Sequence, residues 1–103
     1  MSTNLGTFVA LSPVLVTPEF AIPSGSAIVV EVTAVADMPS SVSDGNATFG
    51  ALALAPVGFS SHNGVTKKVF RGVVKTRGAF SVEVDMSPSD PTIYVSASVW
   101  YVG

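Results

Sequence analysis

The chain has 103 residues, of which 48% are hydrophobic and only 12% are charged, and its formal net charge is −2. Its length predicts one domain with its own core, and a charged share well below the usual value of about 25% suggests a surface partly covered by another chain. The net charge gives no overall attraction to nucleic acid or an anionic membrane, and the lack of cysteine excludes disulfides and thiolate metal sites.

Residues 1–25 are predicted to form a proline-punctuated edge strand or an extended arm. Pro13, Pro18 and Pro23 lack the backbone donor that a central strand needs, so short edge strands are expected at 7–11 and 14–17. An arm that docks on a neighbouring subunit is the alternative. The stretch has no basic region ahead of its apolar residues, so we expect no signal peptide and synthesis in the cytoplasm.

The middle of the chain is predicted to alternate strands with polar loops. Valine, isoleucine and threonine dominate the strand expected at 27–36, and small residues make up the one expected at 47–55. Long loops are expected at 37–46 and 56–65, where Gly, Ser, Asn and Asp favour turns. The second loop carries the only histidine, His62.

Two further strands, 66–74 and 79–86, are separated by a short Thr-Arg-Gly segment and predict a hairpin. A three-residue loop puts the apolar residues of both strands on one face, which sets Arg71 opposite Glu83. The hairpin contains all five basic residues of the chain: Lys67, Lys68, Arg71, Lys75 and Arg77.

Three interpretations of this basic hairpin stay open. Cations on an exposed hairpin protect it against edge pairing and then need no further function. They also fit an acidic protein partner. A nucleic-acid site is disfavoured because Glu83 and Asp85 neutralise part of the charge and no aromatic residue is expected on the polar face that carries Arg71 and Lys75.

The last predicted strand, 92–102, has two distinct faces. The face expected to point into the core carries Ile93, Val95, Ala97, Val99 and Tyr101. The opposite face carries Tyr94 and Trp100, which a solitary protein has little reason to expose. We expect these two aromatic residues, together with Phe59, at an interface with another chain. The alternative for Trp100 is cover by a loop or the N-terminal arm of the same chain.

These elements predict an all-β fold. No ten-residue stretch has helical periodicity, and six to eight short strands separated by turns are typical of a β-sandwich or a small barrel. We expect a single antiparallel β-sandwich, immunoglobulin-like or jelly-roll-like. The expected core is Ile28, Val30, Val32, Phe70, Val74, Phe80, Val82, Val84, Ile93, Val95 and Val99.

Two segments, Gly-Ala-Phe-Ser-Val-Glu-Val at 78–84 and Ile-Tyr-Val-Ser-Ala-Ser-Val at 93–99, follow each other near the end of the chain. This stretch, about a quarter of the chain, resembles the last two strands of bacterial and bacteriophage immunoglobulin-like domains. Asp90, Tyr94 and Ser96 are spaced as in the signature Asp-x-Ala-x-Tyr-x-Cys, with serine in the place of cysteine. The resemblance implies a sandwich.

The side-chain inventory predicts neither an enzyme nor a cofactor. His62 is the only histidine, and no nucleophile elbow, phosphate-binding loop or dinucleotide fingerprint is present. One histidine without cysteine cannot form a zinc cage, so we expect no metal. A calcium site is a weaker alternative, built from loop oxygens of Asp37, Asp44, Asn46 and Asp90.

The expected function is that of a non-enzymatic structural or interaction subunit. In size and style the chain is similar to decoration, fibre and tail accessory proteins of bacteriophage virions, which implies a capsid or other assembly surface as partner and the virion as location. We also expect a homo-oligomer, with a trimer as one form. The alternatives are a small carbohydrate- or ligand-binding module that uses Phe59, Tyr94 and Trp100, and nucleic-acid binding through the basic hairpin.

Overall fold

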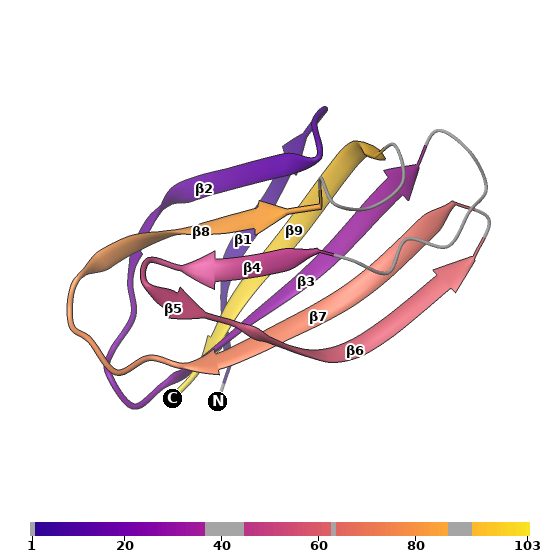
Figure 1. Ribbon diagram of the computed structural model, residues 1–103. Coiled ribbons are helices and arrows are strands. Elements are labelled where there is room, and N and C mark those ends of the chain that lie inside the picture. Colours follow the sequence, from indigo (N-terminus) through magenta and orange to yellow (C-terminus); the bar gives the residue numbers. More distant parts are fainter. Residues whose placement is uncertain (1, 37–44, 63, 87–91) are drawn as a thin grey trace.

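The computed structural model describes residues 2–36, 45–62, 64–86 and 92–103 (Figure 1). Over these residues the chain is an all-β sandwich of two antiparallel sheets, as the sequence predicts. The described part contains no helix long and apolar enough to cross a membrane.

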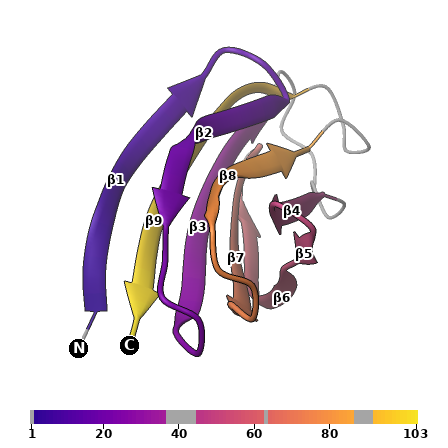
Figure 2. The ribbon, with the colours of Figure 1, turned by 90° about the vertical axis from the view of Figure 1, so that its left-hand side faces the viewer.

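The two sheets share the strands unequally. The five-stranded sheet has the order β1 (Ser2–Ala10), β9 (Thr92–Val102), β3 (Ala27–Ala36), β7 (Val65–Val73) and β6 (Ala55–His62). The four-stranded sheet has the order β2 (Val14–Ala21), β8 (Ala79–Asp85), β4 (Asn46–Phe49) and β5 (Leu52–Ala53). β1 and β2 are therefore edge strands on the same side of the sandwich (Figure 2).

The strand order is that of a jelly roll. Without β6, the two sheets read β1-β9-β3-β7 and β2-β8-β4-β5, which is the arrangement of an eight-stranded jelly roll. The chain crosses between the sheets at most of its connections. β8 and β9 consequently lie in different sheets, whereas the last two strands of an immunoglobulin domain share one.

The predicted hairpin is wrong. β7 pairs with β3 and β6, while β8 pairs with β2 and β4, so the two strands lie in opposite sheets. Arg71 lies opposite Val29, and Glu83 lies opposite Thr48. Alternation identifies the buried face of each strand. The same alternation results whether two strands pair in one sheet or face each other across a core, so it does not predict which strands pair.

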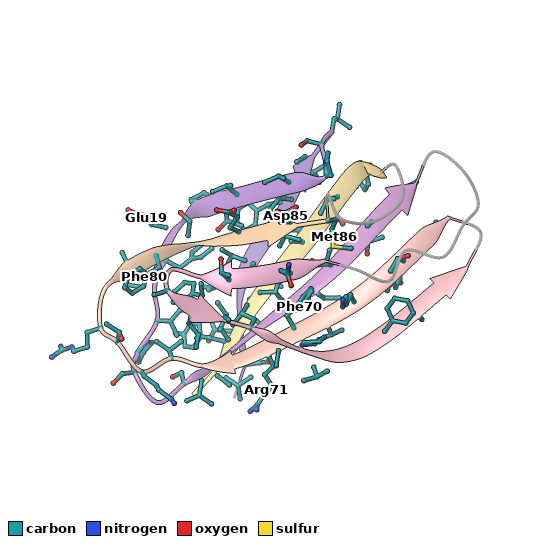
Figure 3. The ribbon with its side chains drawn as sticks, viewed as in Figure 1. Glu19, Phe70, Arg71, Phe80, Asp85 and Met86 are labelled. Atoms are coloured by element: carbon teal, nitrogen blue, oxygen red, sulfur yellow. The ribbon has the colours of Figure 1, made fainter. Side chains whose placement is uncertain are left out.

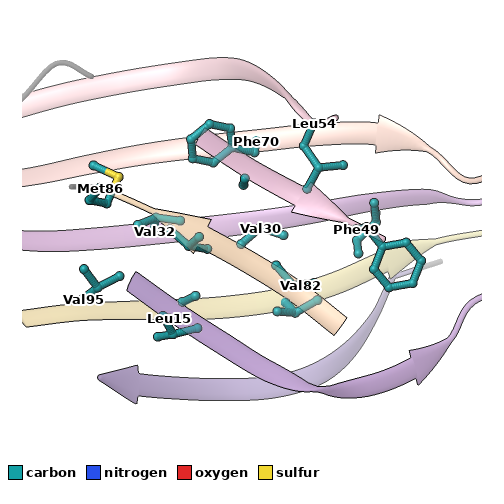
Figure 4. Close-up of a cluster of buried hydrophobic side chains, with 14 of the residues drawn as sticks. Leu15, Val30, Val32, Phe49, Leu54, Phe70, Val82, Met86 and Val95 are labelled. Atoms are coloured by element: carbon teal, nitrogen blue, oxygen red, sulfur yellow. The ribbon is translucent and has the colours of Figure 1, made fainter. Parts of the chain in front are cut away.

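The core lies between the sheets and follows the predicted alternation (Figure 4). The predicted core side chains that are at most 3% exposed are Ile28, Val30, Val32, Phe70, Val74, Val82, Val84, Val95 and Val99. Phe80 is only partly buried and packs edge-on against Phe49, with ring centroids 5.5 Å apart. The side chain of Ile93 lies outside the described part. Leu15 and Met86 complete the core from the four-stranded sheet side.

Residues 47–65 differ most from the prediction. The expected single strand breaks at Gly50, where a φ of +61° reverses the chain between β4 and β5. The expected loop is instead β6, which tolerates Pro56 because it is an edge strand. These two changes raise the number of described strands to nine, one above the expected range.

Candidate interaction surface

Trp100 lies on the outer face of the five-stranded sheet. β9 runs between β1 and β3, so the cross-strand neighbours of Trp100 are Asn4 and Val29. Trp100 is partly exposed, while its chain neighbour Val99 is fully buried, which confirms the predicted alternation. The N-terminal strand therefore lies beside Trp100 within the sheet.

Exposed apolar side chains surround Trp100 on this face. Val102 and Val73, which are 40% and 43% exposed, occupy the next cross-strand row, where both flank the same residue of β3. Arg71 lies opposite Val29 and points away from the sandwich (Figure 3). We call Trp100, Val29, Val73, Val102 and Arg71 the Trp100 surface. Tryptophan and arginine are the residue types most enriched where protein interfaces hold their binding energy.

Tyr94 lies at the other end of the same face. Its cross-strand neighbour is Val35, which in turn lies opposite Val65. Along β9, Tyr94 and Trp100 are about 20 Å apart at about 3.3 Å per residue. The segment between them is polar, and Ser98 shares a hydrogen bond of 2.8 Å with Thr7 of β1. The face thus has two apolar ends and a polar centre.

Phe59 does not join the other two aromatic residues. It is the cross-strand neighbour of Lys68, whose side chain is buried on the inner face of the five-stranded sheet. Phe59 therefore faces the inner side of β6 and remains 52% exposed there. The predicted trio is divided between two faces.

The predicted basic cluster is divided as well. Lys67 and Arg71 are exposed on the outer face of β7, where Glu31 of β3 lies diagonally between them. Lys75 and Arg77 are exposed on the connection from β7 to β8. The carboxylate reduces the positive potential of the outer face.

Lys68 is enclosed by the sandwich. Its side chain is 8% exposed, and its Nζ donates a hydrogen bond to the Gly45 carbonyl oxygen at 3.4 Å. The same Nζ lies 5.4 Å from the centroid of the Phe70 ring, a cation–π distance. Alternation along β7 puts Lys68 on the same face as Thr66 and Phe70, which are both buried in the structure.

A cavity of about 320 Å³ opens where the β4–β5 turn meets the β7–β8 connection. Its lining is mostly apolar, with one cation at the rim: Phe49, Ala51, Leu52, Val74, Lys75, Thr76 and Phe80. The sequence does not reveal this cavity, because its walls come from both sheets and from a turn at a position where the pattern predicts a continuous strand.

The described residues hold no group of three or more His, Cys, Asp or Glu side chains that could bind a metal ion. Of the weaker calcium alternative, only Asn46 is described, as the first residue of β4. Asp37, Asp44 and Asp90 lie outside the described residues, as does the side chain of His62.

Comparisons with protein-family models, curated proteins and solved structures gave no match to this chain.

Proposed function

We propose that the chain is a structural or interaction subunit that binds another protein through the Trp100 surface. The observation that carries the proposal is a tryptophan flanked by exposed valines and an arginine on the outer face of a central strand. On binding, aromatic side chains bury a large area at a low entropic cost, and the backbone of a central strand keeps them at fixed positions.

We further propose that the partner is the surface of a larger assembly, with a virion decoration or accessory role as the leading candidate. Viral capsid domains are among those that use the jelly-roll architecture. That support is an analogy of fold, and one fold serves many functions. The low charged share of 12% adds to it, because a covered surface needs fewer charges.

A ligand-binding module is the second candidate, and the cavity beside Phe80 favours it. Mostly apolar walls with a few polar groups are typical of small-molecule sites. Phe59, Tyr94 and Trp100 would not form its platform, since they lie on different faces or about 20 Å apart. Nucleic-acid binding is weaker still, because the basic residues are spread over three places.

Site-specific photo-cross-linking tests the main proposal. A photoreactive residue in place of Ser98, two residues before Trp100 on the same face of β9, is expected to cross-link to one protein partner. The yield of this cross-linked product should fall strongly in the Trp100→Ala variant. The same photoreactive residue in place of Val57, on edge strand β6 of the same sheet, is the control. The proposal fails if Ser98 captures no protein or if Trp100→Ala leaves the yield unchanged.

A further inference from the structure

The four edges of the sandwich are not equally protected against pairing with another chain. β5 has two residues, β6 contains Pro56 and a register shift, and β2 contains Pro18, Glu19 and a register shift. Short length, proline, charge and bulges are the usual ways in which an edge is blocked. β1 has nine residues without proline or charge, and beyond its own shift at Asn4 and Gly6 it pairs regularly through residues 6–10.

Exposed apolar side chains lie along the two edge strands on this side of the sandwich, with Val9 on the outer face of the five-stranded sheet and those of β2 on the outer face of the other sheet. Among the described residues, the exposed large apolar side chains within residues 9–16 are Val9 at 57%, Leu11 at 85%, Val14 at 37% and Val16 at 61%. Phe8 of β1 also packs against Phe20 of β2, with ring centroids 5.7 Å apart, and both stay partly exposed between the two edge strands. The gap between the two edge strands is thus lined by two partly exposed aromatic rings.

β1 and the turn that follows it carry no charge that would select a charged partner. Residues 2–18 contain no ionisable side chain, and Glu19 of β2 is the first. A cationic or anionic partner would find no complementary group on the β1 edge itself. Two copies of β1, in contrast, meet without a like-charge pair, and identical strands can pair antiparallel around a two-fold axis.

We propose that β1 pairs antiparallel with β1 of a second copy, so that two five-stranded sheets become one sheet of ten strands. The regular segment 6–10 is centred on Phe8, which places Phe8 beside its equivalent and Val9 opposite Thr7 of the second copy. Backbone hydrogen bonds supply the pairing, as in other strand additions, and the partly exposed Phe8 and Phe20 become covered.

This pairing makes the expected homo-oligomer a dimer, and not the trimer that the sequence left open as one form. The two-fold axis stands perpendicular to the joined sheet, so both Trp100 surfaces face the same side. Such a dimer presents two binding surfaces to one assembly, which raises its overall affinity when both engage. The dimer proposal does not depend on the function proposed for Trp100.

Substitution of one exposed edge valine tests the proposal against a matched control. Val9 and Val57 are 57% and 60% exposed and lie on the two opposite edges of the same sheet. Sedimentation velocity is expected to give twice the 10.5 kDa of one chain for the wild type and for Val57→Lys, and a monomer for Val9→Lys. Circular dichroism should show the same β content in all three proteins.

Cysteine cross-linking gives a second measurement if Val9→Lys fails to fold. The chain contains no cysteine, so an equal mixture of the Thr7→Cys and Val9→Cys variants should form a mixed disulfide dimer, whereas Val57→Cys mixed with Val9→Cys should not. A monomeric wild type at high concentration overturns the proposal. So does a dimer that Val9→Lys leaves intact. If Trp100→Ala dissociates that dimer instead, the Trp100 surface holds the copies together and the β1 pairing is wrong.

Discussion

The Oγ1 of Thr17 accepts a hydrogen bond of 2.9 Å from the backbone N–H of Val82. The register between β2 and β8 shifts between Val16 and Glu19, so a side chain takes the place of a ladder carbonyl at this point. The hydroxyl also donates to the Pro18 carbonyl oxygen at 2.8 Å. Thr17 is 4% exposed, and it thereby satisfies the amide of a fully buried core residue within the irregular part of an edge strand.

Replacing Thr17 by valine should therefore destabilise the fold. The change keeps the shape of the side chain but leaves the buried Val82 amide without its acceptor, which costs about 1–3 kcal/mol. Thr17→Ser keeps the hydroxyl and should cost less. The midpoint of urea unfolding measures both variants, and equal midpoints for Thr17→Val and wild type would contradict the assigned role.

Two aromatic residues that the sequence places equally in the core should differ in their effect. Phe70 is 1% exposed, so Phe70→Ala is expected to cost about 3–5 kcal/mol. Phe80 is only partly buried and lines the cavity, so Phe80→Ala should cost less, about 1–3 kcal/mol. Chemical denaturation of both variants checks the order. A larger loss for Phe80→Ala would show that Phe80 is packed more tightly than its partial exposure indicates.

The turn at Gly50 provides a test of close packing. A Cβ at this position would lie 2.6 Å from Cδ1 of the Phe80 ring, and the φ of +61° already disfavours other residues. Gly25 is a matched control, because its φ is +91° but a Cβ there would meet nothing within 4 Å. Both alanine variants carry backbone strain of about 1–2 kcal/mol, and Gly50→Ala should add an overpacking cost of about 1–3 kcal/mol. Equal melting temperatures for the two would contradict the contact.

The inward and outward faces of the strands were predictable, because the alternation of side chains is a property of each strand by itself. Val95 and Val99 point inward and Trp100 outward as expected, since side chains of a strand alternate whichever strand lies beside it. Even the buried position of Lys68 followed from this rule.

The partners of the strands were not predictable by the same rule. β7 and β8 each have an apolar face. The two faces line the core from opposite sheets and do not lie side by side in a hairpin. Phe59 was predicted to lie in a loop, because Pro56 and Gly58 are unfavourable in a strand. Its position on the inner side of β6 was therefore not predicted. The cavity depends on which turn meets which connection, and this requires the order of the strands.

The last prediction concerns Trp100 in the isolated chain. Because its side chain is partly exposed and its neighbours Asn4 and Val29 stand beside it, Trp100→Ala should lower stability by less than the loss expected for Phe70→Ala. Trp100 is the only tryptophan, so intrinsic fluorescence reports this one site. In the free chain a neutral quencher such as acrylamide should reach the indole ring and lower the fluorescence intensity.

Binding of the captured partner should shift this emission to shorter wavelength and reduce quenching, because the indole becomes buried. Tyr94→Ala is the control, since Tyr94 lies on the same face about 20 Å away at about 3.3 Å per residue. It should leave a contact centred on Trp100 largely intact. If Trp100→Ala instead unfolds the isolated chain, packing within the chain accounts for the residue. If stability, binding and assembly all stay unchanged, Trp100 is merely exposed and the proposed surface is wrong.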